Sequence, residues 1–201
     1  MKSVKELPGN YEEVFGIDLA KNKKLAGVVS VISLAIAVVA VAVGCLKVSL
    51  LSLFDMTGGF GRYCMRFGIL IAGMLVYILL HEAVHGVFMY LFSGEKPFFG
   101  ISPMYAYAGS RAYFGKTEYL TIALSPVVFW GIVLGVIGEF VPQEWFWVVY
   151  AIQVVNLSGA AGDLYVFFRF LRLPGEILVN DTGVAMTVYA PAFKENQKQS
   201  G

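Results

Sequence analysis

Charged residues are scarce in this sequence of 201 residues. Lys, Arg, Asp and Glu make up 14% of the chain, whereas hydrophobic residues make up 58% and the mean hydropathy is +0.70. Soluble globular domains carry about 25% charged residues, so this composition excludes a cytosolic enzyme and a disordered chain. The formal net charge of +1 offers no basic surface for phosphates, which excludes a nucleic-acid binder. We therefore expect a membrane protein.

Cysteine and histidine are also rare. Cys45 and Cys64 are the two cysteines, and neither belongs to a CxxC pair or to another metal-ligand spacing. We expect them to fill space rather than to hold the fold together. The two histidines, His81 and His85, stand close together in one apolar segment.

Long hydrophobic runs are abundant. A helix needs about 20 apolar residues to cross the hydrocarbon layer of a membrane, and four runs of that order carry one acidic residue or none. They predict four transmembrane helices, over residues 25–46, 67–92, 119–138 and 145–168.

Two connecting segments have the composition of short strands and turns. The first, residues 100–111, follows the second apolar run, and the second, residues 177–189, contains a turn signal at 180–183 in which Gly183 is expected to take a positive φ. The predicted fold class is thus an all-α membrane protein with about four transmembrane helices, a short β-like segment after the second and a short β-like C-terminal tail. Its predicted parts are an N-terminal cytoplasmic segment (1–24), a transmembrane core (25–172) and a C-terminal cytoplasmic tail (173–201).

The distribution of Lys and Arg predicts the orientation. Basic residues precede the first run, lie between the second and third, and follow the fourth, whereas residues 139–144 contain none. Since Lys and Arg are enriched on the cytoplasmic side, we expect a multi-pass protein of the cell membrane with both termini in the cytoplasm.

The segment from His81 to His85 has the form HExxH. On a helix, residues four apart share a face, so both imidazoles can bind one metal ion while Glu82 reaches a ligand on that ion. A polar packing cluster is the alternative interpretation. Placing Glu near the bilayer centre costs about 2.5–3.5 kcal/mol, and ionisable residues there usually serve function. The pattern therefore predicts a zinc hydrolase with Glu82 as its catalytic residue.

A catalytic zinc ion commonly has three protein ligands, so a third must come from elsewhere. Asp163 is the acidic residue inside the fourth run. Counting back from the cytoplasmic ends of the spans places Glu82 and Asp163 at a similar depth, roughly 14 to 17 Å inside the boundary. Asp163 is the predicted third ligand, and Asp181 is the alternative.

Asn156 lies two helical turns before Asp163 and shares its face. It is a candidate for binding substrate. The alternative is a hydrogen bond between neighbouring helices, the usual role of polar residues in membranes.

These motifs resemble those of the site-2 proteases, which are intramembrane zinc metalloproteases with an HExxH on one transmembrane helix, a β-like segment after it, and an Asp preceded by Asn on a later helix. The chain is similar, over about residues 68–189, to a family of small bacterial membrane proteins described as zincin peptidases. The resemblance implies zinc ligation by His81, His85 and Asp163, a catalytic base at Glu82 and substrate binding at Asn156. One departure is that Asp163 is preceded by a glycine and followed by Leu164, whereas site-2 proteases typically carry an Asp-Gly pair.

The predicted function is intramembrane zinc-dependent hydrolysis of peptide bonds, with Zn2+ as the cofactor and the lipid bilayer and a membrane protein or peptide as partners. A non-catalytic zinc-binding membrane protein, serving structure, sensing or transport, is the alternative. A structural site would have no use for Glu82, and a transporter is expected to place further ligands at other depths.

Overall fold

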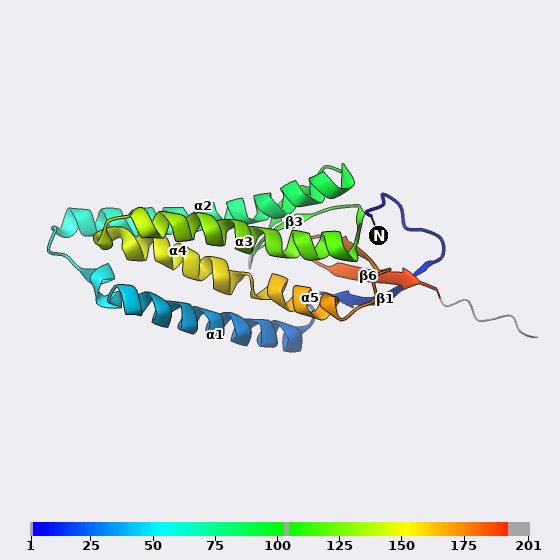
Figure 1. The fold of residues 1–201 in the computed structure, drawn as a ribbon, viewed down its shortest axis with the longest axis horizontal. Helices are drawn as coiled ribbons and strands as arrows, with labels where there is room; N and C mark the ends of the chain where they lie inside the picture. Colours follow the sequence, from blue (N-terminus) through cyan, green and yellow to red (C-terminus); the bar gives the residue numbers. More distant parts are fainter. Residues whose placement is uncertain (1, 103–104, 193–201) are drawn as a thin grey trace, which may run out of the picture.

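The computed structural model describes residues 2–102 and 105–192. Long helices run side by side along the molecule, and the β-strands gather at one end of this bundle (Figure 1). The N-terminus of the chain and the last strand lie at that same end.

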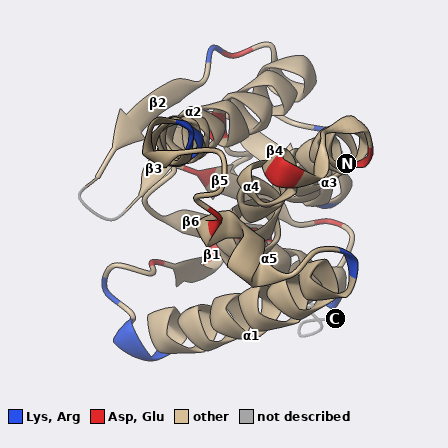
Figure 2. Ribbon diagram, turned by 90° about the vertical axis from the view of Figure 1, so that its left-hand side faces the viewer, with Lys and Arg blue, Asp and Glu red and all other residues tan. Residues whose placement is uncertain are grey.

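Four helical segments are long and apolar enough to cross a membrane, with mean hydropathies between 1.2 and 2.8. This confirms the predicted fold class and makes the chain a multi-pass membrane protein. Seen from the end, α1 is free of charged residues except near its two ends (Figure 2). The helices are α1 (Lys23–Lys47), α2 (Phe60–Ser93), α3 (Lys116–Phe140), α4 (Phe146–Gly159) and α5 (Ala161–Leu171), with short 3-10 helices η1 (Leu50–Phe54) and η2 (Gln143–Trp145).

The fourth span is divided between α4 and α5. Ala160, which is fully buried, has φ −76° and ψ 10° and separates the two helices. The sequence predicted one uninterrupted helix here. The break places Asp163 in the first turn of α5, where the positive end of the helix dipole favours a carboxylate.

Helix α4 occupies the centre of the bundle and contacts α1, α2 and α3. Its approach to α1 depends on Gly44, because a Cβ atom there would clash with the Tyr150 ring. Tyr150 donates a hydrogen bond of 2.8 Å to the carbonyl oxygen of Ala40 on α1. Small residues therefore let polar contacts form inside the bundle, as expected for membrane helices.

The strands form two antiparallel sheets. The larger has the order β1-β6-β5-β4, and the smaller pairs β2 with β3. The predicted strands in the second connection and in the C-terminal tail are confirmed, as is the positive φ of Gly183, at 74°. The strands are β1 (Tyr11–Ile17), β2 (Phe98–Ile101), β3 (Ala106–Gly109), β4 (Tyr113–Gly115), β5 (Leu178–Asp181) and β6 (Met186–Pro191).

Strand β1 was not predicted. It pairs only with β6, at the edge of the sheet, and Ile17 is the one buried residue among its seven. An edge strand with a single buried side chain lacks the alternating hydrophobic pattern by which strands are recognised. Through β1, the segment before α1 and the C-terminal tail form one sheet.

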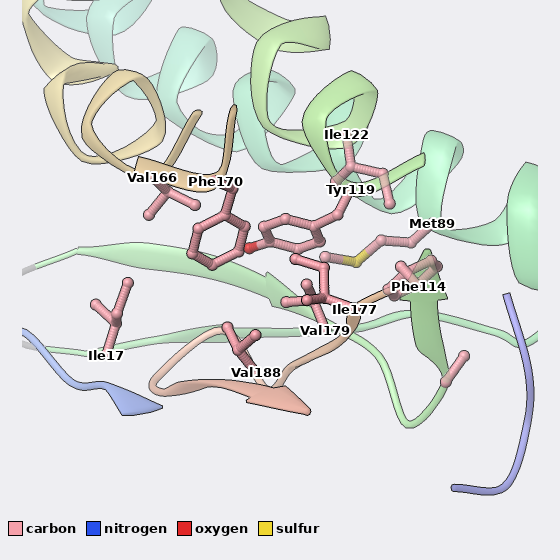
Figure 3. Close-up of a cluster of buried hydrophobic side chains, with 11 residues drawn as sticks. Ile17, Met89, Phe114, Tyr119, Ile122, Val166, Phe170, Ile177, Val179 and Val188 are labelled. Atoms are coloured by element: carbon pink, nitrogen blue, oxygen red, sulfur yellow. The ribbon is translucent and has the colours of Figure 1, made fainter. Parts of the chain in front are cut away.

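The largest hydrophobic core among the described residues lies where α3 and α5 meet this sheet. Phe170 of α5 and Tyr119 of α3 point toward the strands, and Phe114, Val179 and Val188 meet them from the sheet (Figure 3). All five side chains are at most 2% exposed. This packing anchors α3 and α5 to the sheet and so sets the position of Asp163 near the start of α5.

Candidate metal centre

The HExxH segment lies within α2, and its two histidines point to the same side of the helix. The centroids of the His81 and His85 rings are 5.0 Å apart. The two side chains are 12% and 11% exposed. The spacing of four residues thus has the expected effect of bringing both rings together.

Asp163 completes a group of three. Its Oδ2 atom lies 3.4 Å from Nε2 of His81 and 3.6 Å from Nε2 of His85. The three ligand atoms all lie within 4.8 Å of one another. Ligands arranged tetrahedrally around zinc at about 2.0–2.1 Å are about 3.3 Å apart. Two imidazoles and one carboxylate, so spaced, fit a zinc ion with a fourth position left for a non-protein ligand.

Both histidines are held through the ring nitrogen that faces away from Asp163. Nδ1 of His85 lies 3.0 Å from the carbonyl oxygen of Ile122 on α3. Since a carbonyl only accepts, Nδ1 carries the hydrogen, and in the neutral ring Nε2 keeps its lone pair for a metal. Donation of the second ring N–H to a carbonyl or similar acceptor is the usual arrangement around zinc-binding histidines.

His81 is held by a series of hydrogen bonds through two further side chains. Its Nδ1 lies 2.9 Å from the hydroxyl oxygen of Tyr77, and that hydroxyl donates to Oδ1 of Asn156 at 2.8 Å. The amide nitrogen of Asn156 donates to the carbonyl oxygen of Val127 at 3.2 Å, which establishes which side of the amide faces Tyr77. The Tyr77 oxygen is therefore left to accept from His81.

Asn156, predicted to bind substrate, is fully buried in α4. Its oxygen accepts from Tyr77 and its nitrogen donates to Val127 and, at 3.4 Å, to Gln153. The structure thus places Asn156 behind His81, with its polar atoms engaged by neighbouring helices.

Glu82 lines the same cavity as the two histidines. Its Oε2 atom accepts a hydrogen bond of 2.9 Å from the backbone N–H of Ala108. That residue belongs to β3, and its N–H points at Glu82 rather than at the paired strand β2. Strand β3 thereby positions the predicted catalytic carboxylate.

Asp181, the alternative third ligand, lies outside this group of three. Its Oδ2 accepts from the hydroxyl of Tyr119 at 2.5 Å, and its Oδ1 accepts from the backbone N–H of Gly183 at 2.7 Å. Burial raises the pKa of Asp181, and these two hydrogen bonds oppose that rise. Its contacts support the β5–β6 turn at the cavity wall.

The cavity has a volume of about 420 Å³. Its polar wall contains His81, Glu82 and Asp163, and its apolar wall includes Ile17 at the end of β1 and Val29 of α1. The sequence did not predict that the N-terminal segment reaches the site.

Sequence reasoning also missed Tyr77 and the backbone groups of Ile122 and Ala108. A signal for Tyr77 was available, since it stands four residues before His81 on the same helix face. Backbone groups leave no such signal, because every residue carries them.

Comparison with known proteins agrees with this geometry. Residues 74–178, just over half of the chain, match the model of a family described as "Putative zincin peptidase". A protein of Pyrococcus woesei described as an uncharacterized 24.7 kDa protein in the gap 5' region is 27% identical over 124 residues, which are 58% of this chain and 53% of the relative. The chain thus matches about half the length of that relative. No solved structure matches the chain significantly.

The matched residues include the whole HExxH segment, Asp163, and the strands β2 to β4. A zincin carries its zinc on an HExxH helix, so the description fits the arrangement of ligand atoms in α2 and α5. The chain belongs to this zincin peptidase family, and its membership points to a metallopeptidase.

Proposed function

We propose that the protein is an intramembrane zinc metalloendopeptidase of the site-2 protease type, which hydrolyses peptide bonds of membrane-embedded or juxtamembrane substrates. The observation that carries this proposal is the convergence of three ligand atoms beside Glu82, at a cavity between membrane-spanning helices. Ionisable groups are costly to place in a bilayer, and those that occur there usually serve a function.

The residues divide into two roles. His81, His85 and Asp163 would hold zinc, which when bound acts as a Lewis acid and lowers the pKa of a water toward about 7. The Glu82 carboxylate takes a proton from the attacking water and passes it to the leaving amine. The N–H of Ala108 orients that carboxylate for the transfer.

An extended substrate would be held by β3. Residues 106–108 line the cavity, and the Ala108 N–H faces Glu82, so one edge of β3 faces the site. A helical substrate has its carbonyl groups bonded internally and must unwind before attack. Pairing with a strand edge would stabilise the unwound segment.

Ala106→Pro tests this edge, because proline removes a backbone N–H without adding a charge. We expect cleavage to be lost while the zinc content, measured by mass spectrometry on purified protein, stays at the wild-type value. Full cleavage by this variant would contradict pairing with β3.

The sheet end of the bundle would face the cytoplasm of the cell. Lys23 begins α1, Lys116 begins α3, and Arg169 and Arg172 follow the metal centre at that end. Both ends of the described chain enter the same sheet, so both would lie in the cytoplasm if Lys and Arg face that side as they usually do.

A non-catalytic zinc protein is the competing function. A structural zinc site is closed by four protein ligands. Among the described residues, the group that could hold a metal contains His81, His85 and Asp163, and it opens on a cavity. This favours catalysis over a structural role.

Glu82→Gln separates the two functions, because it removes the base and keeps the size of the side chain. We expect peptidase activity to fall by about 10²- to 10⁴-fold with zinc retained. The activity can be measured as new protein termini, identified by mass spectrometry in membranes of cells that produce the wild-type protein or Glu82→Gln. Identical sets of termini in both membranes, at equal zinc content, would refute the peptidase.

A further inference from the structure

Pro126 lies inside α3 and is fully buried. In a regular helix, the carbonyl of each residue accepts from the N–H four residues later. The partner of the Ile122 carbonyl would therefore be the N–H of residue 126, and proline has none. The proline at this position therefore leaves the Ile122 carbonyl oxygen without its helical hydrogen-bond donor.

The freed oxygen is used by the metal centre. It lies 3.0 Å from Nδ1 of His85 and accepts a second hydrogen bond, of 2.9 Å, from the Ser125 hydroxyl. Met89 and Ile122 pack in the same buried cluster, so α2 and α3 are held at a defined distance here. The His85 ring thus lies between a carbonyl on one side and Asp163 on the other.

We propose that Pro126 is a positioning residue of the metal centre. By vacating the Ile122 carbonyl, it provides the acceptor that holds the hydrogen of His85 on Nδ1 and directs the Nε2 lone pair toward the metal. This inference rests on the proposed zinc site, and it holds whether or not the bound ion hydrolyses peptides.

His81 supplies an internal comparison. Its Nδ1 is held by Tyr77 and Asn156, with no contribution from the Ile122 carbonyl. Two independent anchors, one for each histidine, make separate predictions for Pro126 and for Tyr77. A proline that only bends the helix would not distinguish between the histidines.

The experiment uses the full chain in lipid nanodiscs, loaded with zinc and labelled with 15N-histidine. Because the chain has two histidines, the spectrum contains two imidazole N–H signals. Pro126→Ala restores an N–H at residue 126, which competes for the Ile122 oxygen. We expect one of the two signals to shift and to exchange faster with solvent, and zinc affinity, measured against a competing chelator, to fall by about 10- to 100-fold.

Tyr77→Phe should produce the same changes in the other signal, because it removes the acceptor of His81. The matched controls are Pro142→Ala, a proline in the connection before α4, and Tyr150→Phe, a tyrosine whose hydroxyl binds Ala40. Both should leave the two signals and the zinc affinity unchanged. Pro126→Val, which keeps more of the side-chain volume and also restores the N–H, replaces Pro126→Ala if that variant does not fold.

Three outcomes are distinguishable. Separate effects of Pro126→Ala and Tyr77→Phe on the two signals support the proposal. Unchanged signals and unchanged affinity in both Pro126 variants overturn it, as would equal shifts of both signals in each variant. Failure of the wild-type protein to bind zinc would instead overturn the metal site of the proposed function.

Discussion

Buried polar groups occur at both ends of the helix bundle, and they are used differently. At the sheet end, the Nε2 atoms of His81 and His85 face a cavity. At the opposite end, Arg66 is 5% exposed, and two of its nitrogens donate to the backbone: Nη1 to the carbonyl oxygen of Glu144 at 3.2 Å and Nη2 to that of Asp55. The histidine cluster, His81 and His85, leaves ring lone pairs available for a ligand. The cluster around Arg66 instead attaches two connecting segments to α2.

This difference shows that burial alone does not identify a functional polar group in a membrane protein. Arg66 ties the segment after η1 and the start of η2 to one helix, which is a structural task. The histidines are oriented by groups behind them, so that their reactive atoms remain directed into the cavity. What separates the two clusters is that each neutral imidazole keeps a lone pair directed into the cavity, whereas the Arg66 guanidinium has only donors.

The largest effect is expected for loss of the third ligand. Asp163→Ala removes the one carboxylate oxygen that lies between the two Nε2 atoms, so stoichiometric zinc and all peptidase activity should be lost. Asp181→Ala is the matched control, because its carboxylate is engaged by Tyr119 and Gly183 and should leave zinc in place. Metal analysis of the two purified variants decides between them. Retained zinc in Asp163→Ala beside lost zinc in Asp181→Ala would reverse the assignment.

The opposite end should respond in stability rather than in metal binding. Arg66→Ala removes two hydrogen bonds from a charged donor, each contributing about 1.5–3 kcal/mol, so we expect the free energy of unfolding in detergent to fall by about 3–6 kcal/mol. Zinc content should not change. Arg62→Ala is the control, because Arg62 is half exposed and makes one 3.3 Å ion pair with Glu144, which is typically a contribution under about 1 kcal/mol. Equal losses in both variants would show that Arg66 is not the group that ties the connections.

The sequence predicted those parts of the molecule that depend on side-chain type and spacing. Hydrophobic runs gave the four spans, since only helices satisfy the backbone inside lipid over such lengths. The depth of Asp163 could be counted along a helix, and the structure places its carboxylate beside both histidines.

Other features depend on contacts between distant segments. The pairing of β1 with β6, and the break at Ala160, are set by packing against the sheet and neighbouring helices rather than by a local pattern. Pro126 illustrates the limit most clearly. Its place in the sequence indicates a bend in α3, whereas its consequence for His85 depends on which residue of α2 lies opposite the Ile122 carbonyl.

The smallest expected effect concerns how the N-terminal segment is attached near the metal end. Lys5 forms an ion pair of 2.7 Å with Glu95, just beyond α2, and its hydrogen bond and charge lower the pKa of that carboxyl below its usual 4.5, with a smaller contribution from Arg111. Because the pKa is lowered in the folded state, the ionised carboxylate stabilises the attachment at pH values above its ordinary pKa. This stabilisation is lost as the pH falls below that value. Amide exchange at Val4, whose N–H donates to Tyr113 at 2.8 Å, should therefore show increased opening, after correction for intrinsic exchange, between pH 6 and about pH 4. Lys5→Met should remove most of this pH dependence. A wild-type opening equilibrium that stays constant over this range would show that backbone pairing alone attaches the segment.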